Sequence, residues 1–178
     1  MKKYKIAVLD DYQNVALESA DWSVLRDRAD IAVFQDHLAD PDAVIERLLP
    51  FDVVCVMRER TPLPRNVIER LPNLKLIAST LRTATTASRN AWGAIALYQD
   101  QIVHVSQIDI DILDRVGGGD SFASGLIYGL LVGKPIEWAV RCGVAHGALA
   151  MTTAGDTSMA SLAEVERAMK GGSARIAR

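Results

Sequence analysis

The chain has 178 residues, enough for one domain of ordinary size with a hydrophobic core of its own. Apolar residues make up 49% and charged residues 24%, a composition that is normal for a globular protein and excludes global disorder. The formal net charge of -2 gives no reason to expect nucleic acid or an anionic membrane surface as a partner.

The cysteines and the N-terminal segment indicate a cellular compartment. Cys55 and Cys142 both lie in apolar runs and are interpreted as buried thiols in a reducing environment. The apolar run at residues 4–9 is too short for a signal peptide, and no stretch approaches the roughly 20 apolar residues that cross a bilayer. The sequence therefore predicts a cytoplasmic protein with no membrane partner.

The first half of the sequence alternates between strand and helix patterns. Four short β-branched runs are almost continuously apolar, as is typical of parallel strands buried on both faces. These runs are residues 4–9, 30–34, 51–57 and 74–79. Between them, Asp40 and Pro41 are typical of a helix start, and Val44, Ile45 and Leu48 recur at helical spacing. The order predicts a βαβαβαβ half with right-handed crossovers.

The pattern changes after residue 79. Residues 80–90 are rich in Thr and Ser and are predicted as a polar linker. Residues 91–98 and 101–108 flank the turn signal Gln99-Asp100, which favours an antiparallel hairpin.

Three helices are predicted after the hairpin. The first covers about residues 118–131, and the second begins at Pro135 and carries two glycines on its apolar face. The third begins at Ser161, where Glu164 lies at the spacing of a capping box. All the elements together predict one three-layer α/β domain over residues 1–178. Its sheet is mainly parallel, with at least four strands in the flavodoxin-like order 2-1-3-4, followed by the antiparallel hairpin and a helical C-terminal part.

Three glycines and an acid lie at the start of the first of these helices. Gly117, Gly118 and Gly119 would let the backbone approach an anion closely, and the first N–H groups of the helix have no intrahelical partner. Asp120, in the same turn, could take a proton from an attacking hydroxyl while those N–H groups hold charge on a phosphoryl group. The spacing alone leaves two interpretations open: a phosphate site with a working carboxylate, or a glycine turn that only begins a helix.

The wider sequence resembles a known family at this place. Residues 110–131, IDILDRVGGGDSFASGLIYGLL, resemble the anion-hole motif of ribokinase-type sugar kinases. Residues 80–178 as a whole resemble the C-terminal part of 2-keto-3-deoxygluconate kinases, which belong to that family.

The resemblance implies a role for each matching residue. Asp120 takes the place of the catalytic base for the sugar hydroxyl, and the glycines at 117–119 take the place of the anion hole. Asp114 matches the acid that opens the motif and organises its loop. Thr80 and Arg82 lie where the phosphate- and adenine-binding segment of the family begins.

The first half resembles a different family. Residues 3–79, which include KIAVLDDYQNVALESADW at 5–22, are similar to the N-terminal segment of D-2-hydroxyacid dehydrogenases, a flavodoxin-like half. The dinucleotide fingerprint G-x-G-x-x-G is absent from the sequence, and the catalytic Arg, Glu and His of that family come from later sequence. Residues 58–61 match a loop that contacts substrate in the family, so at most a fragment of that pocket is expected.

Several features that a sugar kinase needs are not recognisable in the first half. The sugar pocket and the β-sheet lid are missing from the pattern, and Asn66 and Glu69, at the Asn-x-x-Glu spacing, are interpreted as a solvated helix face. No spacing of His, Cys and Asp matches a metal site. His37, His104 and His146 are interpreted as structural or solvated side chains.

The two resemblances meet near Ser79 and Thr80, inside or at the end of a strand. We interpret the chain as an engineered or recombined subdomain chimera of residues 1–79 and 80–178, folded but without a complete active site. It requires no cofactor, and weak binding of ATP or phosphate is expected at the glycine-rich helix start. The alternative is an ATP-dependent sugar kinase that acts like a 2-keto-3-deoxygluconate kinase. Hydrophobic surface left uncovered by the join predicts a homodimer.

Overall fold

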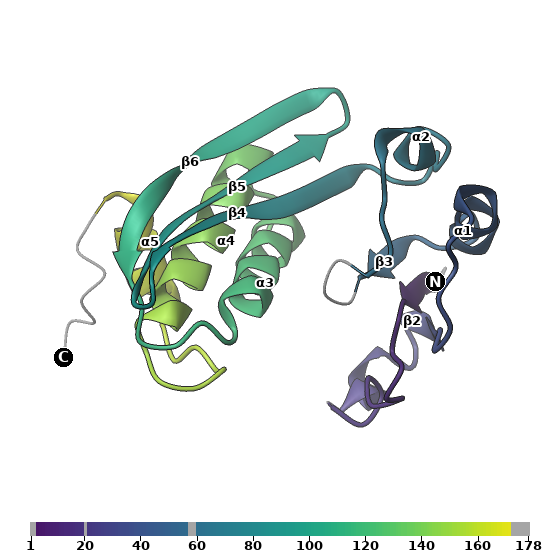
Figure 1. Cartoon of the computed structure of the whole chain (residues 1–178), viewed down its shortest axis with the longest axis horizontal. Helices are drawn as coiled ribbons and strands as arrows, with labels where there is room; N and C mark the ends of the chain where they lie inside the picture. The colour runs from purple at the N-terminus through teal and green to yellow at the C-terminus, as the bar shows by residue number, and fades with distance from the viewer. Residues whose placement is uncertain (1–2, 20, 57–59, 172–178) are drawn as a thin grey trace. The chain divides into compact units, whose positions relative to one another are not determined.

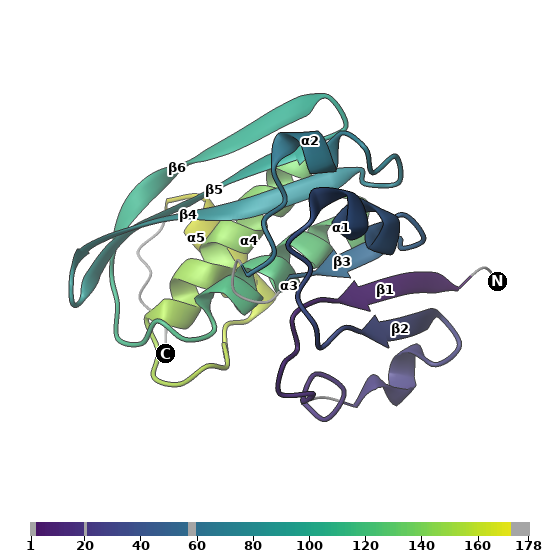
Figure 2. The same ribbon diagram turned by 45° about the vertical axis from the view of Figure 1, so that its right-hand side comes forward.

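The computed structural model describes residues 3–19, 21–56 and 60–171. The chain divides into two compact units, Met1–Lys75 and Leu76–Arg178, and each is described by itself (Figures 1 and 2). This boundary lies close to the predicted join at Ser79 and Thr80, whereas the single domain over residues 1–178 stays a prediction. None of the helices in the described part of the chain is long and apolar enough to cross a membrane. The fold class is the predicted mixed α/β.

The first unit contains a parallel sheet. Its strands are β1 (Tyr4–Val8), β2 (Ala29–Val33) and β3 (Val53–Cys55). They lie in the order β2-β1-β3, with Ile6 of β1 opposite Ile31 on one side and Val53 on the other. The first three positions of the predicted order are therefore confirmed.

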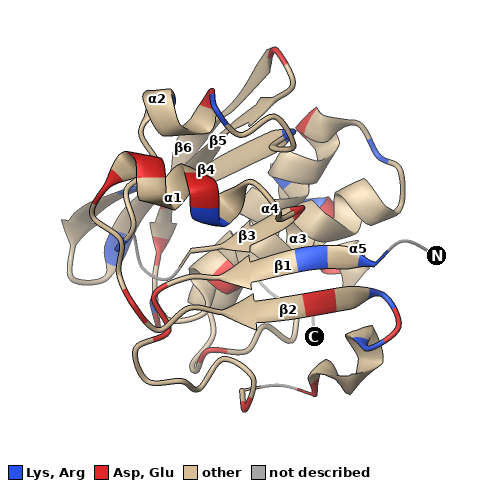
Figure 3. Cartoon of the chain, turned by 90° about the vertical axis from the view of Figure 1, so that its right-hand side faces the viewer, with Lys and Arg blue, Asp and Glu red and all other residues tan. Residues whose placement is uncertain are grey.

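The helices of the first unit follow local sequence signals. They are the 3-10 helix η1 (Trp22–Leu25), α1 (Pro41–Leu48) and α2 (Arg65–Ile68). Asp40 caps α1 as predicted, because its carboxylate accepts the N–H of Ala43 at 3.1 Å. The buried face of α1 packs with Ala7 and Leu9 at the sheet. Figure 3 shows basic and acidic residues interspersed over this unit. Lys5 on β1 is in register with Asp30 on β2.

One prediction about the first unit was wrong. Cys142 is buried in the second unit as expected, but Cys55 is exposed. Cys55 ends β3, which has only three residues and lies at the edge of its sheet among the described residues, so no neighbouring strand covers it on the outer side.

The second unit contains an antiparallel sheet. Its strands are β4 (Leu76–Thr86), β5 (Arg89–Tyr98) and β6 (Gln101–Asp111), in the order β4-β5-β6. The predicted hairpin of β5 and β6 is confirmed, and its turn holds Gln99 at φ 54°.

Two predictions fail at β4. Residues 74–79 were expected as a fourth parallel strand and residues 80–90 as a linker, but β4 runs through both segments and pairs antiparallel with β5. The threonines that suggested a linker are β-branched and suit a half-exposed strand. A short apolar run does not by itself distinguish a parallel strand from an antiparallel one.

Two long helices lie against one face of this sheet, as Figure 1 shows. The helices of the unit are α3 (Gly118–Leu131), α4 (Ile136–Met151) and α5 (Leu162–Met169), close to the predicted ranges. The predicted capping box of α5 is present, with the Glu164 N–H bonded to the Ser161 hydroxyl and the Glu164 carboxylate bonded to the Ser161 N–H. The shared core includes Trp92 from β5, Phe122 from α3 and Val140 from α4.

Candidate functional site

The loop that leads into α3 is shaped by Gly117. This residue is the N-cap of α3 and has φ 81°, a left-handed conformation that L side chains rarely adopt. A Cβ atom at this position would lie 2.2 Å from the carbonyl oxygen of Asp156. Two independent constraints therefore require glycine at 117.

The carboxylate of Asp114 holds the two sides of this loop together. Its two oxygens accept the N–H of Val116 at 3.0 Å and the N–H of Gly155 at 3.2 Å. These bonds lower the pKa of Asp114, the bond from Val116 most strongly. The N–H groups of Leu113 and Asp114 also donate to the carbonyl of Met151 at the end of α4. The loop is thus fixed to the segment after α4 on several sides.

The three glycines of the motif differ in their surroundings. A Cβ atom at Gly118 would lie 2.9 Å from the Met151 side chain, so this position faces the core. A Cβ atom at Gly119 would have no neighbour within 4 Å, and Gly119 and Asp120 are both exposed. The first turn of α3 therefore has a closed side and an open side.

The open side combines backbone N–H groups, which favour an anion, with the carboxylate of Asp120. No side chain caps α3, whose first N–H groups and dipole together favour an anion. Among the described residues, the Asp120 carboxylate has no hydrogen bond or ion pair, so it is available to a ligand. A carboxylate beside an anion-binding helix start can accept a proton from a hydroxyl that attacks the bound anion.

Thr80 and Arg82 lie on β4, directly opposite Ala94 and Trp92 of β5. Both therefore lie on the sheet face that packs on the helices, and Arg82 is exposed. Within the described ranges, no hydrogen bond or ion pair joins either residue to Asp114 or Asp120. The structure thus brings together 114 and 117–120, with Thr80 and Arg82 on the neighbouring sheet.

A pocket of about 180 Å³ lies next to the motif in the second unit. Ser124, which lines it, follows Asp120 by four residues and so shares its side of α3. The lining residues are Ser124, Gly125, Tyr128, Cys142, His146, Ala160, Leu162 and Val165. Burial lowers the pKa of the His146 imidazole, which also contacts the backbone of Ser121. The imidazole is therefore neutral at neutral pH.

The sequence interpretation of His146 as a packed side chain missed this pocket. Tyr128 and Ser124 are four residues apart on α3, and His146 and Cys142 are four apart on α4. Two such stripes at helical spacing, in consecutive helices, were the available signal. Which faces meet depends on the crossing of α3 and α4, which the sequence pattern does not give.

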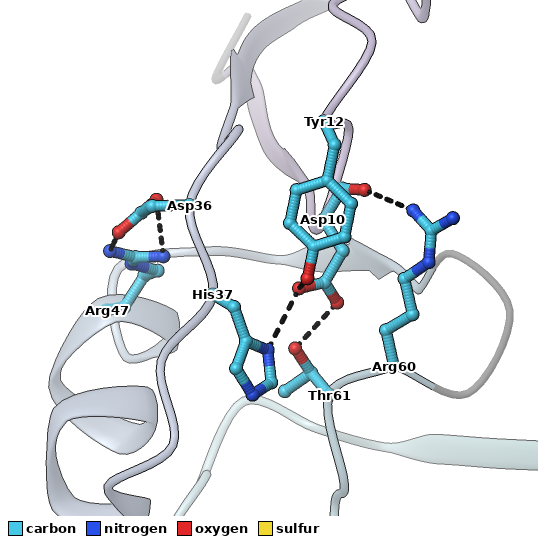
Figure 4. A network of polar contacts seen from close by, with 7 residues as sticks. All are labelled: Asp10, Tyr12, Asp36, His37, Arg47, Arg60 and Thr61. Atoms are coloured by element: carbon cyan, nitrogen blue, oxygen red, sulfur yellow. Dashed lines mark hydrogen bonds and ion pairs between the residues drawn. The ribbon is translucent and has the colours of Figure 1, made fainter.

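The first unit holds a second polar cluster, at the carboxyl end of β1 (Figure 4). Asp10 is 1% exposed and has φ 59°. Its carboxylate lies 3.2 Å from Nδ1 of His37 and accepts the hydroxyl of Thr61 at 2.6 Å. The Arg60 guanidinium donates to the Asp10 carbonyl at 2.9 Å and lies 4.7 Å from the centre of the Tyr12 ring.

This cluster includes part of the loop predicted from the dehydrogenase resemblance. Arg60 and Thr61 lie in the cluster, whereas residues 58 and 59 lie outside the described residues. His37, interpreted from the sequence as a structural or solvated side chain, is a direct neighbour of Asp10. Buried acids such as Asp10 are bonded to neighbours that fix the loops at the end of the sheet.

One further sequence feature, the Asn-x-x-Glu spacing, is accounted for. Glu69 pairs with Arg65 at 2.6 Å on the exposed face of α2, in agreement with the interpretation of Asn66 and Glu69 as a solvated helix face. Within the described ranges, no group of three or more His, Cys, Asp or Glu side chains could hold a metal ion.

Comparison with known proteins finds the kinase resemblance in both sequence and structure. The family of pfkB carbohydrate kinases matches residues 69–163. A 2-dehydro-3-deoxygalactonokinase of Haloferax volcanii is 31% identical over 145 residues, which are 79% of this chain and 45% of that protein. The chain thus spans about half the length of this curated relative. The crystal structure of a 2-dehydro-3-deoxygluconokinase from Thermotoga maritima matches with a TM-score of 0.68 and 24% identity, over 94% of this chain and 60% of that one.

The resemblance to the second family is also found. A phosphoglycerate oxidoreductase from Vibrio cholerae is 44% identical over 40% of this chain and 22% of its own, with a TM-score of 0.36. The kinase resemblance named from the sequence is therefore confirmed over the larger part of the chain.

Proposed function

Because the chain belongs to the pfkB family of carbohydrate kinases, we propose that its second unit binds the phosphate groups of a nucleotide, ATP, at the first turn of α3. The observation that carries the proposal is the open side of this turn, where Gly119 leaves the backbone uncovered. Gly117 and Asp114 fix the loop before it, so the N–H groups are held in place before a ligand arrives.

The neighbouring pocket supports a nucleoside on the same ligand. It begins one helical turn after Asp120 and is lined by the Tyr128 ring, the neutral His146 imidazole and the apolar side chains of Leu162 and Val165. Such a surface suits a flat aromatic base, which stacks on rings and apolar groups. Phosphates at the first turn of α3 and a base in the pocket would share one face of the helix.

We further propose that the chain is a chimera that binds nucleotide without transferring its phosphate. Productive transfer requires that both reactants are held in line, and poor positioning alone removes many orders of magnitude in rate. No sugar pocket or lid is recognisable in residues 3–79, and Glu69 is engaged by Arg65 on an exposed helix face. ATP is accordingly a ligand of this protein and not a required cofactor.

Titration with ATP and with inorganic phosphate tests binding. A ligand present at about 100 times its dissociation constant stabilises the native state by about 2.7 kcal/mol, so the thermal unfolding midpoint of the second unit is expected to rise. Asp120→Asn should keep or strengthen phosphate binding, because it removes a negative charge beside the anion. An unchanged midpoint with millimolar ATP and millimolar phosphate would refute the proposal.

The second candidate function is an ATP-dependent sugar kinase, favoured by the exposed and unengaged carboxylate of Asp120. Here Asp120 takes the proton of the sugar hydroxyl while the α3 N–H groups hold the transferred phosphoryl group. A coupled ADP-release assay with 2-keto-3-deoxygluconate tests it, with Asp120→Asn as the control. Turnover in the wild type that Asp120→Asn abolishes would replace the binding-only proposal with this one.

A further inference from the structure

The side chain of Asn90 is buried without a hydrogen-bond partner. Asn90 lies on β5 and is 0% exposed, and among the described residues neither its Oδ1 nor its Nδ2 atom has a partner. Trp92 and Ala94, which follow it at two-residue spacing, are buried in the core between sheet and helices, so Asn90 points into the same layer. A buried carboxamide has two donors and an acceptor to satisfy, and native proteins rarely leave them empty.

The strand position of Asn90 places it under the loop that leads into α3. The start of α4 lies at the far end of β5, where Gln101, next to Tyr98 in register, bonds to Glu137. The end of α4 lies at the near end, where Met151 accepts the N–H of Leu113. Helix and strand therefore run antiparallel, and Asn90 faces the end of α4.

The contacts of Trp92 give the next step. A Cβ atom added at Gly147 of α4 would lie 2.8 Å from the Trp92 ring and 2.7 Å from the carbonyl oxygen of Gly118. Asn90 is one strand repeat before Trp92, and Met151 is one helical turn after Gly147. Since Met151 lies against Gly118, the Asn90 amide belongs to the layer directly beneath the glycine motif.

Residues 112–117 follow Ile110, the strand partner of Asn90, and carry backbone polar groups of their own. Ile110 is paired with Asn90 across the sheet, and the Ile112 N–H donates to the Ser88 carbonyl at 2.8 Å. From there residues 112–117 run as a loop to the N-cap of α3. Buried polar groups at such a place are commonly joined by an internal water, which makes about three hydrogen bonds.

We propose that Asn90 binds one internal water molecule that bridges its carboxamide to main-chain groups of residues 112–117, and that Asn90 is thereby a positioning residue for the phosphate site. The second half of this inference rests on the proposed function, whereas the first half does not. Asn90 itself does not touch the ligand. It fixes the position of the loop that leads to Gly117, the N-cap of α3.

The direct test uses the full chain in solution. Magnetisation transfer from a long-lived water to the Asn90 side-chain NH₂ protons is expected in the NMR spectrum of the ligand-free protein. Absence of this transfer, with the Asn90 NH₂ resonances assigned, would overturn the internal water.

The positioning role is tested by Asn90→Leu, which replaces both polar atoms with apolar groups of similar shape and so should change stability little. The affinity for inorganic phosphate is expected to fall about tenfold, by analogy with the loss of metal affinity when a residue that orients a metal ligand is removed. Asn90→Thr, which keeps one hydroxyl for the water, should retain more of the affinity. Val103→Ala, in the same core but opposite Ala96, should lower stability and leave the affinity unchanged.

The outcomes separate the two claims. Wild-type affinity in Asn90→Leu would refute the positioning role. Water transfer to Asn90 in a protein that binds no phosphate would leave the internal water established and refute the proposed function. Phosphate binding without the water would refute the inference alone.

Discussion

At the scale of single residues, the two glycines Gly119 and Gly133 form a matched pair. A Cβ atom at either would have no neighbour within 4 Å, but only Gly133 has a positive φ, of 70°. We expect Gly133→Ala to destabilise the protein by about 1 kcal/mol, because alanine is strained at that φ. Gly119→Ala should not lower stability, yet it should weaken phosphate binding by covering the open turn. Thermal unfolding and phosphate titration of both variants check this, and equal phosphate affinity in Gly119→Ala and the wild type would contradict it.

Asp114 gives a pH-dependent prediction at the same scale. Its pKa is lowered in the folded protein by the N–H groups of Val116 and Gly155. A carboxyl group whose folded pKa is depressed contributes stability above its unfolded pKa of about 3.9, and this contribution is lost as the pH falls through the lower folded value. Asp114→Asn should therefore be less stable than the wild type at pH 6, and the difference should shrink as the pH falls through the lowered pKa of the folded protein. Denaturant unfolding at several pH values measures this, and a stability difference that does not change with pH would rule it out.

The sequence predicted those residues whose roles are set by near neighbours. The cap at Asp40 and the capping box of Ser161 and Glu164 depend on a few consecutive residues, and both are present. The pocket at His146 depends on which faces of α3 and α4 meet, and Asp10 depends on loops about 27 and 51 residues away in sequence. Neither arrangement could be obtained from local spacing.

At the scale of elements, the seam between α3 and α4 is made by glycines. A Cβ atom at Gly125 would lie 2.9 Å from backbone atoms of Cys142 and Gly143. Gly125→Val would push the helices apart, and we expect a loss of about 2 kcal/mol in unfolding free energy. Ala123→Val adds bulk to the exposed face of the same helix and should change stability by only a few tenths of a kcal/mol. Similar losses in the two variants, measured by denaturant unfolding, would show that the seam is not tightly packed.

The strand β4 shows where element prediction from sequence stops. Its apolar first part and its Thr-rich second part have different compositions, which predicted a strand followed by a linker. In the structure the two parts form one strand, because both pair with β5, with a register shift between Ala84 and Thr86. Strand partners are chosen by tertiary pairing, and the apolar pattern of residues 74–79 fits either a parallel or an antiparallel partner.

At the scale of the whole molecule, the two units have separate hydrophobic clusters, so the effects of mutations can be assigned to one unit. Asp10→Asn keeps a residue that tolerates positive φ but removes the charge that faces His37 and Thr61. We expect the first unit to lose about 2 kcal/mol. Amide hydrogen exchange should speed up in residues 4–8 and stay unchanged in residues 118–131.

Asp36, a neighbouring acid of the first unit, provides the control for Asp10. Asp36 forms an exposed ion pair with Arg47 at 2.6 Å, so Asp36→Asn should have a much smaller effect on exchange (Figure 4). Equal effects of the two variants would mean that the buried network around Asp10 does not stabilise its unit. The expected homodimer stays a prediction at this scale.

The central claim is that the glycine motif of the second unit binds nucleotide phosphates. An NMR titration of the full chain with ATP and with inorganic phosphate tests it most directly. The account predicts that the amide resonances of Gly118, Gly119 and Asp120 shift with both ligands, and that resonances around Tyr128 and His146 shift with ATP alone. Millimolar ATP that leaves the amides of residues 118–120 unmoved would contradict the account.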